Sequence, residues 1–109
     1  MQLRPENECI EIPGADAVRV LREIDLVVVS LHRIASYCAA ADKFDQRRYE
    51  QETTRFVDQW EVTKRLAKIR GLLTSCFDLT LGKDEMDDVE REMVSVDYWT
   101  SPQSQPRSS

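Results

Sequence analysis

The sequence has few residues that interrupt a helix. Its 109 residues include three glycines and four prolines, and none of these seven lies between Ala15 and Arg70. Glycine and proline are the least favourable residues inside a helix, so their absence predicts long uninterrupted helices in this stretch. Apolar residues make up 41% of the chain and charged residues 32%. This mixture is typical of a helical bundle and excludes a disordered or fibrous chain.

Long hydrophobic runs are also absent. The run of large aliphatic residues from Leu26 to Val29 is far shorter than the ~20 residues that span a bilayer. The first residues, beginning Met1-Gln2-Leu3, contain no apolar core of the kind found in a signal peptide. The sequence therefore predicts a cytoplasmic protein with no membrane association.

Cysteine and histidine are too sparse and too scattered to form a metal site. Cys9, Cys38 and Cys76 show no CxxC spacing, and His32 is the single histidine. This pattern predicts reduced thiols and no metal or cofactor. One alternative stays open, because the expected helix register brings Cys9 alongside Cys76 and would allow a redox contact between them.

Apolar residues recur at steps of three and four along the first part of the chain, which predicts a helix from about 16 to 40. Ile24, Val28 and Leu31 lie on this repeat. A similar repeat that includes Phe56 and Trp60 predicts a second helix from about 43 to 79, ended by Gly82. At 1.5 Å per residue the second helix would be roughly 55 Å long against roughly 38 Å for the first. An apolar end from 69 to 81 would then project and need cover.

The remaining segments are shorter. Residues 1–13 are expected to form an N-terminal arm, 84–96 a third helix with Asp84 as its N-cap, and 100–109 a disordered tail, with 14–99 as one helical domain. The predicted fold is all-α: a long antiparallel helical hairpin plus a short third helix, paired with a second copy in a four-helix-bundle-like dimer. Candidates for its core and dimer contacts are Ile24, Val28, Leu31, Phe56, Trp60, Leu73 and Phe77. The sequence leaves open whether the two copies run parallel or antiparallel.

The net charge of −5 is concentrated near the C-terminus, in residues 82–99, which we call the acidic segment. Acidic and aromatic side chains there are candidates for binding a protein partner: Asp84, Glu85, Asp87, Asp88, Met93, Tyr98 and Trp99. No catalytic motif accompanies them. The favoured hypothesis is a non-enzymatic protein–protein interaction module, such as an adaptor, chaperone, inhibitor or immunity-type partner.

Two alternatives remain. Lys64, Arg65, Lys68 and Arg70 form a basic cluster that would bind phosphates in a nucleic-acid-associated dimer. No aromatic residue interleaves the cluster, so a solvated helix face is the simpler interpretation and nucleic acid is not the expected partner. The other alternative is a small enzyme with a site composed across the dimer. Its side chains would include Glu23, Asp25 and His32.

Overall fold

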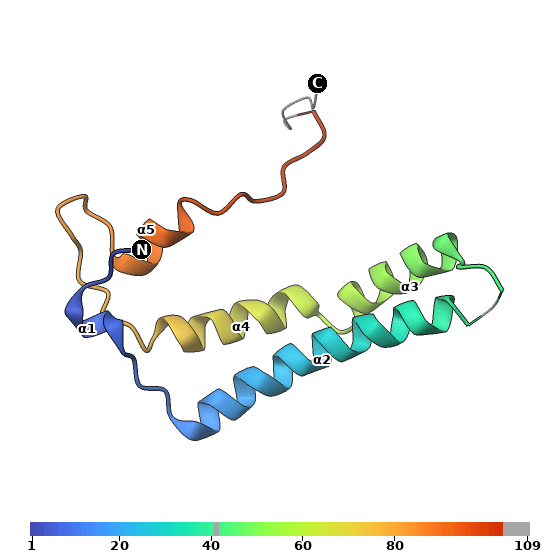
Figure 1. Cartoon of the computed structure of the whole chain (residues 1–109), viewed down its shortest axis with the longest axis horizontal. Helices are drawn as coiled ribbons and strands as arrows, with labels where there is room; N and C mark the ends of the chain where they lie inside the picture. Colours follow the sequence, from blue (N-terminus) through green and yellow to red (C-terminus); the bar gives the residue numbers. More distant parts are fainter. Residues whose placement is uncertain (41, 104–109) are drawn as a thin grey trace. The chain divides into compact units, whose positions relative to one another are not determined.

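The computed structural model describes residues 1–40 and 42–103, and these residues form five helices and no strand (Figure 1). The all-helical class predicted from the sequence is confirmed. The chain divides into two compact units. One, the hairpin unit, runs from Ile10 to Cys76. The other, the terminal unit, combines Met1–Cys9 with the segment that begins at Phe77.

The hairpin unit consists of α2 (Gly14–Cys38), α3 (Gln46–Gln59) and α4 (Val62–Thr74). The last two follow one another and lie antiparallel to α2 (Figure 1). The range of α2 agrees with the predicted helix at 16–40 to within two residues. Asp45 caps α3 by accepting a 3.0 Å hydrogen bond from the backbone N–H of Arg48. Its own N–H donates to the Cys38 carbonyl, which ties the start of α3 to the end of α2.

The single helix predicted from 43 to 79 is wrong, because the structure breaks it at Trp60 and Glu61. Glu61 adopts the left-handed conformation, with φ 50° and ψ 48°, which ends the hydrogen-bonding pattern of α3. Two features stabilise the break. The Trp60 ring packs on Phe56 with centroids 5.7 Å apart. Arg65 Nε donates a 2.7 Å hydrogen bond to the Trp60 carbonyl, one of the oxygens that the end of α3 leaves without a helical partner.

The two arms of the hairpin are also better matched in length than the sequence predicted. α2 has 25 residues, while α3 and α4 have 14 and 13. α4 ends at Thr74 rather than at 79, and hydroxyls at this end bond back to helix carbonyls: Thr74 Oγ1 to Arg70 and Ser75 Oγ to Leu72. Ile69 is 6% exposed within the hairpin. The helix that was predicted to project to residue 79 is therefore not present, although Leu79 and Leu81 remain 44% and 58% exposed beyond α4.

The terminal unit is held together by a buried polar network around Asn7, which is only 2% exposed. Asn7 Nδ2 donates to the Asp78 carbonyl and to Asp88 Oδ2, both at 2.9 Å, and Asn7 Oδ1 accepts from the Asp78 N–H at 2.7 Å. The Arg4 N–H donates to the same Asp88 oxygen at 2.7 Å. The expected N-terminal arm thus contains a one-turn helix, α1 (Pro5–Glu8), fixed by these bonds.

The third predicted helix is shorter than expected and starts later. α5 spans Asp88–Met93 and is capped by Asp87, which forms a reciprocal capping box with Glu90. Asp84, the predicted cap, instead forms an ion pair with Arg91 at 2.7 Å. Gly82 does not end a helix either. A Cβ atom at Gly82 would lie 2.7 Å from Arg91 Nη2, so a side chain there would require the guanidinium to move.

Candidate functional site: two faces of the helical hairpin

The hairpin unit has a narrow core. Among its described residues, 10–40 and 42–76, the buried ones are Val20, Cys38, Phe56, Val62 and Ile69, each at most 7% exposed. These residues mark the line along which α2 faces α3 and α4. Because successive helical residues turn by about 100°, the residues on either side of that line lie on two opposite faces of the hairpin. The two faces differ in chemistry.

One face is apolar and open. On α2 it is formed by residues spaced three, four and three apart, and on the other arm by three residues of α3 and α4. We call this set the apolar face: Leu21, Ile24, Val28, Leu31, Val57, Leu66 and Leu73. Their exposed fractions lie between 37% and 63%, and Leu21 and Val28 are the most exposed. So many large apolar side chains on one surface are typical of an interaction site.

Four of the predicted core and dimer residues lie on the apolar face: Ile24, Val28, Leu31 and Leu73. The others lie elsewhere. Phe56 is buried between the arms, and Trp60 is 47% exposed next to it. Phe77 belongs to the terminal unit and is partly buried there.

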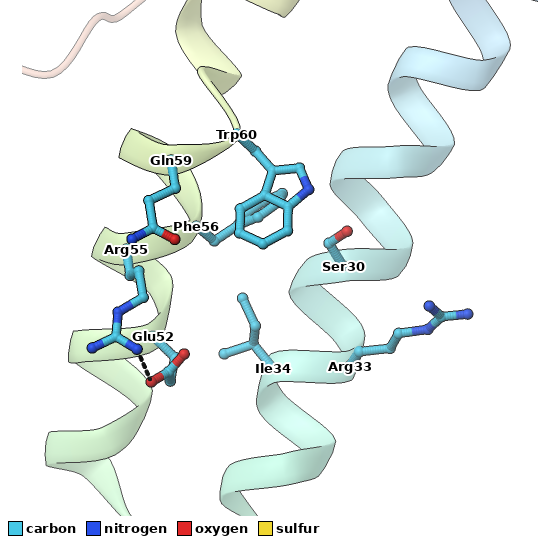
Figure 2. Close-up of a pocket in the computed structure, with 8 residues that line it drawn as sticks. All are labelled: Ser30, Arg33, Ile34, Glu52, Arg55, Phe56, Gln59 and Trp60. Atoms are coloured by element: carbon cyan, nitrogen blue, oxygen red, sulfur yellow. Dashed lines mark ion pairs between the residues drawn. The ribbon is translucent and has the colours of Figure 1, made fainter.

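The opposite face, which we call the polar face, is hollowed between α2 and α3. A cavity of about 430 Å³, the aromatic cavity, is lined by Ser30, Arg33, Ile34, Glu52, Arg55, Phe56, Gln59 and Trp60. In Figure 2, Ile34 and Ser30 point from α2 toward the space beside the Trp60 indole, with the Phe56 ring behind it. Arg33 extends outward from the rim, and Arg55 pairs with Glu52 at 3.5 Å.

A second cavity on the polar face, of about 200 Å³, lies between α2 and α4 and contains most of the predicted basic cluster. Its lining is Arg19, Glu23, Glu61, Lys64, Arg65, Lys68, Ile69 and Leu72. The guanidinium of Arg65 already interacts within the hairpin, since it donates a hydrogen bond to the Trp60 carbonyl and pairs with Glu23 at 3.1 Å. Arg70 lies apart from the others, because two residues beyond Lys68 it faces about 200° away. The cluster therefore does not form one continuous phosphate-binding surface.

The acidic segment divides into buried and open parts. Asp87 and Asp88 are 9% and 2% exposed, so their side chains contribute to the terminal unit rather than to its surface. The hydrogen bonds from Arg91 and from the Met86 backbone lower the pKa of Asp84 from 3.8 to about 2. The Asn7 side chain, followed by the Arg4 backbone N–H, lowers the pKa of Asp88.

The other partner-binding candidates of this segment remain at the surface. Met93, Tyr98 and Trp99 are 48%, 64% and 79% exposed. Glu85 is exposed and adopts a left-handed conformation with φ 63°. These four candidates lie on the exposed part of the acidic segment, together with neighbours such as Val94, which is 72% exposed.

The residues of the enzyme alternative are dispersed. Glu23 pairs with Arg65, while Asp25 and His32 are exposed on α2, about two helical turns apart, and line neither cavity. Among residues 1–40 and 42–103, no three His, Cys, Asp or Glu side chains are grouped as metal ligands. All three cysteines are free thiols, with Cys38 buried.

Neither a protein-family model, nor a curated protein, nor a solved structure matches this chain. Within the described part of the chain, every helix is too short or too polar to cross a membrane.

The aromatic cavity is the feature that sequence reasoning missed. Phe56 and Trp60 stand at a spacing of i and i+4, which places two side chains together on a helix surface, but the sequence does not distinguish such a pair from ordinary core packing.

Proposed function

We propose that this chain is a non-enzymatic protein interaction module whose apolar face binds a second copy of the same chain, so that two hairpins form a four-helix assembly. The observation that carries the proposal is the exposure of seven large apolar side chains on one face of the hairpin. Added together, their exposed fractions correspond to about three fully exposed side chains per copy. Burying one such side chain contributes roughly 1.5–3 kcal/mol, so leaving all of them in water is costly.

The spacing and the charges of the face favour a second copy as its occupant. Leu21, Ile24, Val28 and Leu31 follow the three–four spacing that packs helices together in four-helix bundles. A two-fold dimer buries the same surface on both copies, so that surface must complement itself. The edges of the apolar face carry charges of both signs, Asp25 on α2 and Arg70 on α4, as a self-complementary surface requires.

The first test compares two neighbouring valines. Val28→Glu places a charge on the apolar face, whereas Val29→Glu places the same charge about 100° further round α2, on its outer side. Val28 is 59% exposed and Val29 38%, so neither change disturbs the core of the hairpin. Light scattering is expected to give about twice the 12.7 kDa chain mass for the wild type and for Val29→Glu, and 12.7 kDa for Val28→Glu.

Circular dichroism provides the control for this comparison, since both variants are expected to retain the helical signal of the wild type. A wild-type mass of 12.7 kDa, or equal masses for the two variants, would contradict the proposal. In the proposed assembly the polar face of the hairpin stays free, and Met93, Tyr98 and Trp99 are exposed within the terminal unit. They are the surfaces with which the dimer would act on a different protein, as an adaptor, chaperone, inhibitor or immunity-type partner.

A further inference from the structure

The aromatic cavity has the features of a receptor for an apolar side chain. Its inner wall is formed by Phe56, Trp60 and Ile34, which come from both arms of the hairpin (Figure 2). Phe56 is 5% exposed and Trp60 47%, so one ring is buried and holds the other at the surface. Ser30 and Gln59 add polar groups beside this wall. Aromatic residues placed in this way are enriched among the residues that dominate protein interfaces.

The backbone places Trp60 at this position at a conformational cost. Glu61, the next residue, has φ 50°, in the left-handed region that costs a non-glycine residue roughly 1–2 kcal/mol. The Arg65 bond to the Trp60 carbonyl and the Arg65–Glu23 ion pair stabilise that geometry. A straight helix through 60 and 61 would have avoided this cost.

The charge around the cavity indicates the sign of its ligand. The two cavities of the polar face are lined by six cationic side chains and three carboxylates, on a protein whose net charge is −5. No carboxylate among residues 1–40 and 42–103 forms an ion pair with Arg33, Lys64 or Lys68. These three cations are available to a ligand. The polar face therefore favours a negatively charged occupant.

We infer that the polar face binds an acidic peptide segment of a partner protein. One large apolar side chain of the segment enters the aromatic cavity between Trp60 and Ile34. Carboxylates on either side of that anchor pair with Arg33 at one end and with Lys64 and Lys68 at the other. This inference goes beyond self-association, because the polar face lies on the opposite side of the hairpin from the apolar face.

An acidic peptide fits these residues better than a nucleic acid. Glu23, Glu52 and Glu61 are interspersed with the cations and would repel a continuous phosphate backbone, which carries a charge on every nucleotide. An acidic peptide with spaced carboxylates can place its charges beside the cations alone. The cavity also offers the apolar surfaces of Ile34, Phe56 and Trp60 to a side chain of such a peptide.

The test is an NMR titration of the full-length chain. The protein contains two tryptophans, so the indole N–H resonance of Trp60 is assigned by comparison with Trp60→Phe and Trp99→Phe. The probe is the acetylated and amidated peptide Asp-Glu-Phe-Asp-Glu. Two control peptides replace its phenylalanine by alanine or its four acids by lysines. A saturable shift of the Trp60 resonance is expected with the probe and with neither control.

Charge reversal tests the role of Arg33. Arg33→Glu is expected to weaken the affinity for the probe by about fivefold. This factor corresponds to the upper end of what one exposed ion pair contributes. The matched control is Arg47→Glu, an exposed arginine of α3 that lines neither cavity, and it should leave the affinity within about twofold. Equal effects of the two reversals would show that only net charge matters and would overturn the inference.

Two further results would also overturn it. One is a Trp60 resonance that the acidic probe does not move or that the lysine control moves equally. The other is displacement of the probe from the cavity by a twelve-nucleotide oligothymidine, which would assign the face to nucleic acid. The titration should give the same shift in Val28→Glu, because that substitution lies on the apolar face. The inference and the proposed dimer can therefore fail independently.

Discussion

At the scale of single residues, neighbouring carboxylates of the acidic segment occupy very different surroundings. Asp88 is 2% exposed and accepts bonds from Asn7 and from the Arg4 backbone. Asp84 is exposed but pairs with Arg91. Asp87 and Glu90 have the spacing of a capping box, but the sequence analysis assigned the cap to Asp84 instead. The bonds to Asn7 join residues about eighty positions apart, which no local pattern predicts.

The Asp84–Arg91 pair predicts how the terminal unit responds to acid. Because the pKa of Asp84 is lowered from 3.8 to about 2 in the folded chain, this carboxylate stabilises the folded state above pH 4. That contribution is lost as the pH falls from about 4 to about 2. Carboxyl NMR titration should give a pKa near 2 for Asp84 in the wild type and a value close to 3.8 in Arg91→Gln. A wild-type pKa near 3.8 would contradict the ion pair.

At the scale of elements, the break between α3 and α4 is the main difference from the sequence prediction. The apolar repeat runs through Trp60 without a phase change, and neither Gly nor Pro marks the position. The break depends on contacts from elsewhere in the hairpin. Arg65 donates a hydrogen bond to the Trp60 carbonyl, and Glu23 forms an ion pair with Arg65. Local helix propensity does not report such long-range contacts. The sequence therefore predicted two arms but not the division of the second arm into α3 and α4.

The left-handed conformation of Glu61 predicts opposite effects for two substitutions. Glu61→Gly should increase the free energy of unfolding by about 1 kcal/mol, because glycine adopts positive φ without a steric cost. Glu61→Val should decrease it by about 1 kcal/mol, because a β-branched residue is strained there. Urea unfolding followed by Trp60 fluorescence in a Trp99→Phe background measures both. A loss of stability in Glu61→Gly would show that this backbone conformation is wrong.

The faces of the elements show the same limit of sequence reasoning. The three–four repeat included Phe56, which is buried on the line where the arms meet, but it assigned Ile69 to a projecting end although Ile69 is 6% exposed. It did not distinguish this line from the adjacent apolar residues, such as Val28, that remain exposed in the single chain. Which apolar residues are left over depends on how the two arms rotate against each other, and tertiary packing decides that rotation.

At the scale of the whole molecule, the physical reason for assembly differs from the one that the sequence suggested. The sequence predicted that a longer second helix would leave an apolar end between 69 and 81 uncovered. In the structure the arms are matched, and the exposed apolar surface lies along one side of the hairpin instead. Helix lengths depend on where each helix ends. No glycine or proline marks the end of α4 at Thr74, so the sequence pattern did not locate it.

The most direct test of the proposed assembly asks what covers the apolar face in solution. An isotope-filtered NOE experiment on a one-to-one mixture of labelled and unlabelled chain detects only contacts between different copies. We predict intermolecular NOEs that involve the methyl groups of Ile24, Val28 and Leu73. Their absence at a concentration where the wild-type chain is dimeric would contradict the account, because another surface would then join the two copies.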